Sequence, residues 1–171
     1  MSISRALTAV LVLAGCSPTL DWRETRPEGA GVVAMFPCRP DRHARPVVVA
    51  GASTRMEMLV CTAGGARFAV SFMDLADPTA VTPALAELRA TALANIGGVQ
   101  RGSEPAQVSG MTANSQAARL AMSGRLPDGT AVQEQAAFFV KGLRIYQASV
   151  IGAKLVPEMT DTFFAGLKLP S

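Results

Sequence analysis

The sequence of 171 residues has little histidine, few aromatic side chains and little charge. It holds one histidine, His43, and charged residues make up 17% of the chain. A structural zinc site needs three or four clustered ligands, which a chain with one histidine assembles poorly. The formal net charge of +3 is also far from the basic surplus of a nucleic-acid-binding protein. We therefore expect no metal, no cofactor and no nucleic-acid partner.

The motifs that usually mark catalysis are missing as well. The sequence has no Gly-x-Ser-x-Gly elbow, and His43 has neither a nucleophile nor an orienting acid at a recognisable spacing. Gly64 and Gly65 lack the lysine and helix start of a phosphate-binding loop. Asp77, the acid nearest to Asp74, is better explained as a helix cap than as an acid/base partner. The sequence thus predicts a protein that is not an enzyme.

The apolar run at residues 6–14 is too short to span a bilayer, which takes about 20 residues. It follows Arg5 and precedes the small residues Ala14 and Gly15, an arrangement typical of a secretory signal peptide. We assign residues 1–15 to that peptide. The rest of the chain is long enough for one domain, predicted at residues 30–171.

The tetrapeptide Leu-Ala-Gly-Cys that ends at Cys16 resembles the bacterial lipobox. The resemblance implies cleavage before Cys16 and a lipid anchor on its sulfur, so that the protein is held on a membrane of the cell envelope. Ser17, in place of an acidic residue, favours the outer membrane, with the domain facing the periplasm. The alternative is an ordinary secreted protein in which Cys16 happens to follow the signal peptide.

Residues 16–29 contain two prolines and mixed charges without periodicity, which is typical of a tether. Trp22 is the one aromatic residue in this stretch. It either packs on the edge of the domain or sits at the lipid interface.

Cys38 and Cys61 remain once Cys16 is lipidated. In an oxidising envelope a structural disulfide between them is expected. A reactive thiol pair or a metal site is the alternative, but the two cysteines do not have Cys-x-x-Cys spacing and only one histidine accompanies them.

Alternating apolar residues and turn signals predict a mainly antiparallel sheet. Asp77 and Thr82 each precede a proline, which predicts a single turn and then a long helix that begins at Pro83. Pro105 confines the strand that contains it to an edge. The predicted strands span residues 31–36, 46–49, 54–62, 67–75, 99–108, 116–126, 130–140 and 143–151, and the helices span residues 83–96 and 157–165. This order predicts an α+β domain with helices packed on an antiparallel sheet.

Several segments are similar to the PsbP-like α/β/α sandwich, which includes envelope lipoproteins of the DcrB type. They are the strand that ends at Phe36 and Pro37, the hairpin up to Phe72, the middle helix, and the close at residues 162–169. The resemblance implies the fold of residues 30–169 and carries over no binding site. The cysteine pair is not part of the family pattern.

A candidate binding surface lies in the segment after Cys38, which we expect to be a loop. It contains Arg39, Arg42, His43 and Arg45, which together offer either an anion-binding surface or a merely solvated loop. Two functions fit the sequence as a whole. The first is a non-enzymatic envelope lipoprotein that binds another protein as an accessory or chaperone-like module. The second is a small-ligand or lipid carrier with an apolar pocket in the sandwich.

Overall fold

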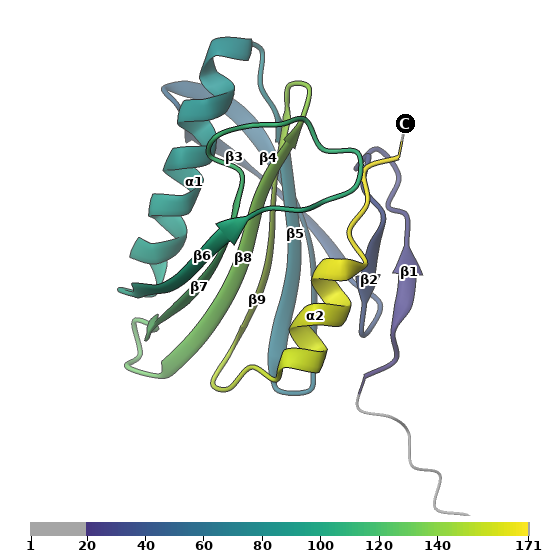
Figure 1. Ribbon diagram of the computed structural model, residues 1–171, viewed down its shortest axis with the longest axis vertical. Coiled ribbons are helices and arrows are strands. Elements are labelled where there is room, and N and C mark those ends of the chain that lie inside the picture. The colour runs from purple at the N-terminus through teal and green to yellow at the C-terminus, as the bar shows by residue number, and fades with distance from the viewer. Residues whose placement is uncertain (1–19, 171) are drawn as a thin grey trace, which may run out of the picture.

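The computed structural model describes residues 20–170, and Figure 1 shows a twisted sheet with α1 and α2 on opposite sides of it. Seven antiparallel strands form the sheet in the order β3-β4-β5-β9-β8-β7-β6. A separate two-stranded ribbon, β1-β2, lies on the same side as α2. The expected α+β class, with helices on an antiparallel sheet, is confirmed. In chain order the strands are β1 Arg23–Thr25, β2 Ala34–Phe36, β3 Asp41–Val49, β4 Ala52–Ala63, β5 Ala66–Asp74, β6 Val99–Pro105, β7 Ala118–Arg125, β8 Ala131–Lys141 and β9 Arg144–Gly152, and the helices are α1 Val81–Asn95 and α2 Pro157–Ala165.

The central strands are apolar on both faces because each face covers a separate core. Successive residues of a strand point to opposite faces, so Phe138 and Phe139 of β8 belong to different clusters. The cluster around Phe138 includes Leu85 and Leu88 of α1. The cluster around Phe139 includes Phe163 of α2. The molecule therefore has three layers, with α1 as one outer layer and α2 with the ribbon as the other.

One buried side chain on the α1 side is a carboxylic acid. Glu134 of β8 is only 7% exposed, and its cross-strand partners are Met122 and Ile151. Burial disfavours the ionised form and raises the pKa of Glu134 to about 7.

The long helix begins earlier than expected. Asp77 caps a single 3-10 turn, Pro78–Ala80, by accepting a hydrogen bond from the Thr79 backbone N–H at 2.8 Å. The α-helix then starts at Val81, and Ala80 precedes it without a side-chain cap, so the expected cap at Thr82 is wrong. Pro83 is tolerated inside the first turn because the first backbone N–H groups of a helix have no intrahelical acceptor.

The folded domain begins before residue 30, so the predicted tether at residues 16–29 is too long. Residues 23–25 form β1 and pair with β2. Trp22 packs edge-to-face on Phe68, with ring centroids 5.7 Å apart, which supports the interpretation of Trp22 as a residue of the domain edge. The hydroxyl of Tyr146 donates to the Ala30 carbonyl at 3.0 Å and fixes the next stretch to the sheet. Cys16 and the signal peptide at residues 1–15 lie outside the described residues.

The two described ends of the chain leave the domain at opposite ends of the sheet. Leu20 lies against Gly64 in the β4-β5 turn and beside Met159. Pro170, at the other end, accepts a hydrogen bond from Lys141, next to the β8-β9 turn. Figure 1 shows the C-terminus at that far end. Within residues 20–170, the structure has no helix with the length and apolar character needed to cross a membrane.

A candidate binding groove around Arg119

The expected basic loop is instead mostly an edge strand. Residues 41–49 form β3, which pairs only with β4 in the sheet order. The alternation of a strand therefore separates Arg42 from His43 and Arg45, which point to the opposite face. Arg42 is engaged within the domain: it pairs with Glu57, and its Nη1 donates to the Glu28 carbonyl at 2.8 Å. Arg39 precedes the strand and is exposed. The structure thus does not gather the four residues into one anion site.

Cys38 and Cys61 lie at disulfide-bonding distance, with Cα atoms 5.9 Å apart. Cys61 belongs to β4 and is buried in the core beneath the ribbon, whereas Cys38 follows β2 and is half-buried. A bond between them would attach the ribbon to the sheet. Oxidation of the pair stays a prediction.

A hollow lies between α2 and the β6-β7 side of the sheet. It is an open groove of about 480 Å³. The sheet side is formed by β6, the segment after it, Arg119 of β7 and Ala137 of β8, and the other wall is formed by α2. Val108, Phe164 and Leu167 contribute apolar surface, and Glu104 and Asp161 contribute carboxylates.

Arg119 reaches this groove because of its place in β7. Ala118, Leu120 and Met122 are buried against α1, so Arg119 must face the α2 side. The strand register sets it opposite Glu104 of β6.

The acidic and aromatic partners of Arg119 come from one side of α2. Asp161 and Phe164 are three residues apart, so they lie on the same side of the helix.

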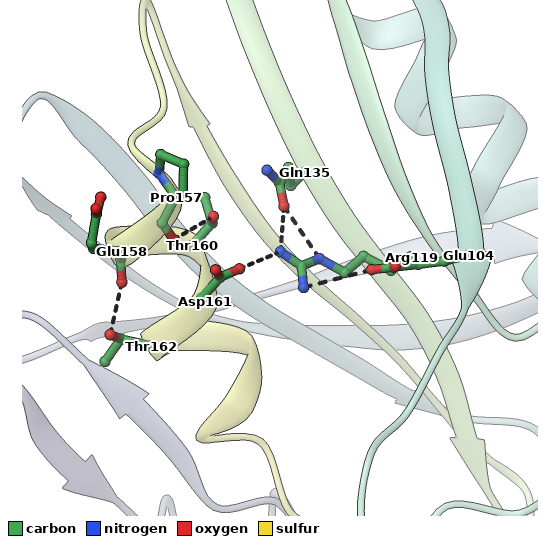
Figure 2. Close-up of polar contacts among 8 residues, drawn as sticks. All are labelled: Glu104, Arg119, Gln135, Pro157, Glu158, Thr160, Asp161 and Thr162. Atoms are coloured by element: carbon green, nitrogen blue, oxygen red, sulfur yellow. Dashed lines mark hydrogen bonds and ion pairs between the residues drawn. The ribbon is translucent and has the colours of Figure 1, made fainter.

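The guanidinium of Arg119 is held by four side chains. Its carbon lies 4.2 Å from the centroid of the Phe164 ring. Nε and Nη2 both donate to Oε1 of Gln135, at 3.2 and 2.5 Å. Asp161 approaches Nη2 at 3.3 Å and Glu104 approaches Nη1 at 3.7 Å. Figure 2 shows the guanidinium between Gln135, Glu104 and Asp161, with Asp161 reaching in from α2.

This geometry leaves recognition groups available to a ligand. Within residues 20–170, Nη1 of Arg119 donates no hydrogen bond, because the oxygen of Glu104 lies beyond hydrogen-bond distance. The arginine side chain is 23% exposed, whereas the side chains of Glu104 and Asp161 are 64% and 69% exposed. The three side chains together carry a net charge of −1. The groove therefore presents a fixed donor, two movable acceptors and an apolar wall.

No protein-family model and no curated protein matches the chain. The groove therefore has to be interpreted from its own chemistry. In the part of the chain that the structure describes, no three potential metal-ligating residues come together.

Sequence reasoning missed this groove because its polar residues come from four separate elements. The one available signal was Arg119 itself, which alternates with apolar residues in β7, a strand whose other residues are mostly small or apolar. That pattern marks Arg119 as a residue of the opposite face, but it does not identify the partners.

Proposed function

We propose that the protein is a non-enzymatic envelope lipoprotein, anchored through Cys16, that binds a segment of another protein in the Arg119 groove. In this role it is an accessory or chaperone-like module on the outer membrane, facing the periplasm. The proposal includes membership of the PsbP-like fold family, of the DcrB type. The sequence resemblance supports that membership, as does the placement of α1 and α2 on opposite faces of an antiparallel sheet.

The arrangement around Arg119 carries this proposal. A backbone carbonyl of a bound segment can accept from Nη1 of Arg119, while a basic side chain binds Glu104 and Asp161. An apolar neighbour can then pack on Phe164 and Leu167. The two rim carboxylates disfavour an anionic ligand, because they would repel it before it reached the arginine.

The second candidate function is a carrier of a small, mainly apolar ligand. It is favoured by the volume of the groove, about 480 Å³, which lies in the range of about 300 to 1,000 Å³ found for small-molecule sites. Native mass spectrometry of the purified protein distinguishes the two functions. A co-purifying small molecule that is lost from the Arg119→Gln variant supports the carrier, and an apo protein supports recognition of a protein segment.

A photo-crosslinking amino acid at Gln107 tests the groove in the native cell. Gln107 is exposed and lines the groove, so we expect it to give a discrete protein adduct. Arg119→Gln should lower the yield of that adduct about tenfold, because a hydrogen bond to a charged group contributes about 1.5 to 3 kcal/mol. The adduct is measured by immunoblot and identified by mass spectrometry.

The matched control places the same crosslinker at Ala90, on the exposed side of α1. Equal adducts from Gln107 and Ala90, or an adduct that Arg119→Gln leaves unchanged, would contradict the groove as the binding site. The melting temperature of Arg119→Gln is recorded as well, because a lost yield counts only if the variant is folded.

The anchor is tested independently of the groove. Cys16→Ala should remain unprocessed or become soluble, because it removes the sulfur to which the lipid is attached. Partition into a detergent phase and the intact mass report the outcome. A variant that has the mature mass and still enters the detergent phase completely would contradict anchoring through Cys16.

A further inference from the structure

A second hollow lies at the end of the sheet where Leu20 enters the domain. It has a volume of about 510 Å³ and its lining includes Arg101, Ser123, Arg125 and Ala153. The register locates it, because Ala66 next to the Leu20 contact is opposite Gly152, which precedes Ala153. The hollow and the N-terminal entry therefore share one end of the molecule, which we call the Leu20 end.

Two arginines in this hollow are held in place and keep donors available. Nε of Arg101 donates to the Ser123 hydroxyl at 2.7 Å. Nη1 of Arg125 donates to the Gly129 carbonyl at 2.9 Å. Each guanidinium has five N–H donors, so further donors remain for a phosphate group, which arginine binds in a bidentate manner.

The surroundings extend this positive charge. Arg67 and Lys154 are exposed near the Leu20 end, one at the start of β5 and one directly after Ala153. Along the chain, the acidic residue nearest to Arg101 is Glu104, the one nearest to Arg125 is Asp128, and the one nearest to Lys154 is Glu158. Asp128 accepts a hydrogen bond from the Thr130 backbone N–H at 2.9 Å within the β7-β8 turn.

Exposed apolar side chains accompany the charge. Val99 lines the hollow and is 52% exposed, and Val156 follows Lys154 by two residues and is 44% exposed. Basic residues with neighbouring apolar side chains form a surface that suits the interface of an anionic membrane.

The short distance from Cys16 to the domain brings this end close to a membrane. Leu20 already packs on the core, and it lies only four positions along the chain from the proposed anchor. Even fully extended, those four steps of the chain span about 14 Å. A domain anchored through Cys16 is therefore held with its Leu20 end at the membrane surface.

We propose that the Leu20 end docks on anionic phospholipids, with Arg101 and Arg125 binding a headgroup phosphate and Val99 and Val156 contacting the interface. This inference rests on the proposed anchor at Cys16. It adds a fixed orientation, because docking sets the Leu20 end of the sheet on the membrane and holds Arg119, further along β7, above the lipid.

Docking is tested on the mature acylated protein reconstituted in vesicles. A polarity-sensitive fluorophore is attached at Val156→Cys, and vesicles of phosphatidylcholine alone are compared with vesicles that also contain phosphatidylglycerol. We expect a blue-shifted, brighter signal only with phosphatidylglycerol, reversed by salt. Arg101→Gln and Arg125→Gln should each lower the ratio of docked to undocked protein about fivefold, as expected for about 1 kcal/mol per basic residue at an anionic surface.

The control is the pair Arg45→Gln and Arg55→Gln, which removes the same charge from neighbouring positions on the β3-β4 hairpin, away from the Leu20 end. An equal loss in this control, or no response to phosphatidylglycerol in the acylated protein, would overturn the docking proposal. Inorganic phosphate that raises the melting temperature of the wild type but not of Arg101→Gln would assign the hollow to a free phosphate and overturn docking on lipid. If the intact mass of the purified protein shows no acyl chains and the protein does not sediment with vesicles, the proposal of an anchor at Cys16 is wrong.

Discussion

The free energy of unfolding of Glu134→Gln, taken relative to that of the wild type, should be higher at pH 8 than at pH 4. The pKa of Glu134 is raised from 4.5 to about 7 by burial, so the folded protein retains a proton that the unfolded chain has already lost. Stability therefore falls as the pH rises from about 4.5 to 7 and stays at the lower value above that. At 1.36 kcal/mol per pKa unit, the difference between the two pH values is up to about 3 kcal/mol.

Urea unfolding of both proteins across this pH range measures the effect. Comparing the two ends of the range removes any constant cost of burying an amide in place of the Glu134 carboxyl group, because that cost does not change with pH. Glu158→Gln is the matched control, since Glu158 is exposed at the start of α2. Parallel stability curves for the wild type and Glu134→Gln would show that the carboxyl group does not titrate in this way.

Removing the bond between Cys38 and Cys61 should cost about 3 kcal/mol of stability. The two cysteines are separated by 23 positions in the sequence, and the chain-entropy model gives about 3 kcal/mol for a closed loop of similar length. The ribbon has strands of only three residues, which are marginal unless they are packed against something larger. The bond ties the chain after β2 to β4 at Cys61, next to Phe68, on which Trp22 packs.

The double variant Cys38→Ala, Cys61→Ala is compared with the wild type in urea, each with and without a reductant. At typical slopes of about 1 to 3 kcal/mol/M, the midpoint should fall by roughly 1 to 3 M. Reduction should weaken the wild type by a similar amount and leave the double variant unchanged. Peptide mapping without reduction reports the bond directly, and two alkylatable thiols in the folded protein from the envelope would contradict it.

The central sheet was predictable because its signals are local. Alternation along β4 and the glycine turn before β5 define a hairpin, and the turn at Asp128 and Gly129 defines another. The predicted strands 54–62, 67–75, 116–126, 130–140 and 143–151 lie within two residues of β4, β5, β7, β8 and β9. In each case the cause is a strand that is buried on one or both faces. Such burial sets the polarity of consecutive residues, so the pattern can be seen directly in the sequence.

Segments that depend on distant partners were harder to predict. β3 begins with Asp41 and Arg42, charges that resemble a loop, although charged residues are also common on edge strands. β1 has three residues and no pattern of its own, and it becomes a strand only because β2 is available to pair with it. The groove is the extreme case, since the partners of Arg119 include Glu104 and Asp161 from other elements.

The entry of Leu20 at one end of the sheet limits where a binding partner can be. Ser123 lies in the same strand row as Gly152 and Ala66, next to the Leu20 contact. Arg119 is four residues away from Ser123 along β7, which corresponds to about 14 Å at the rise of a strand. For a protein anchored through Cys16, the groove therefore samples only a thin layer of space above the lipid. A partner attached to the same membrane meets it at a high effective concentration, and even a weak contact is then largely occupied. A freely diffusing partner has no such advantage and would need a much tighter complex.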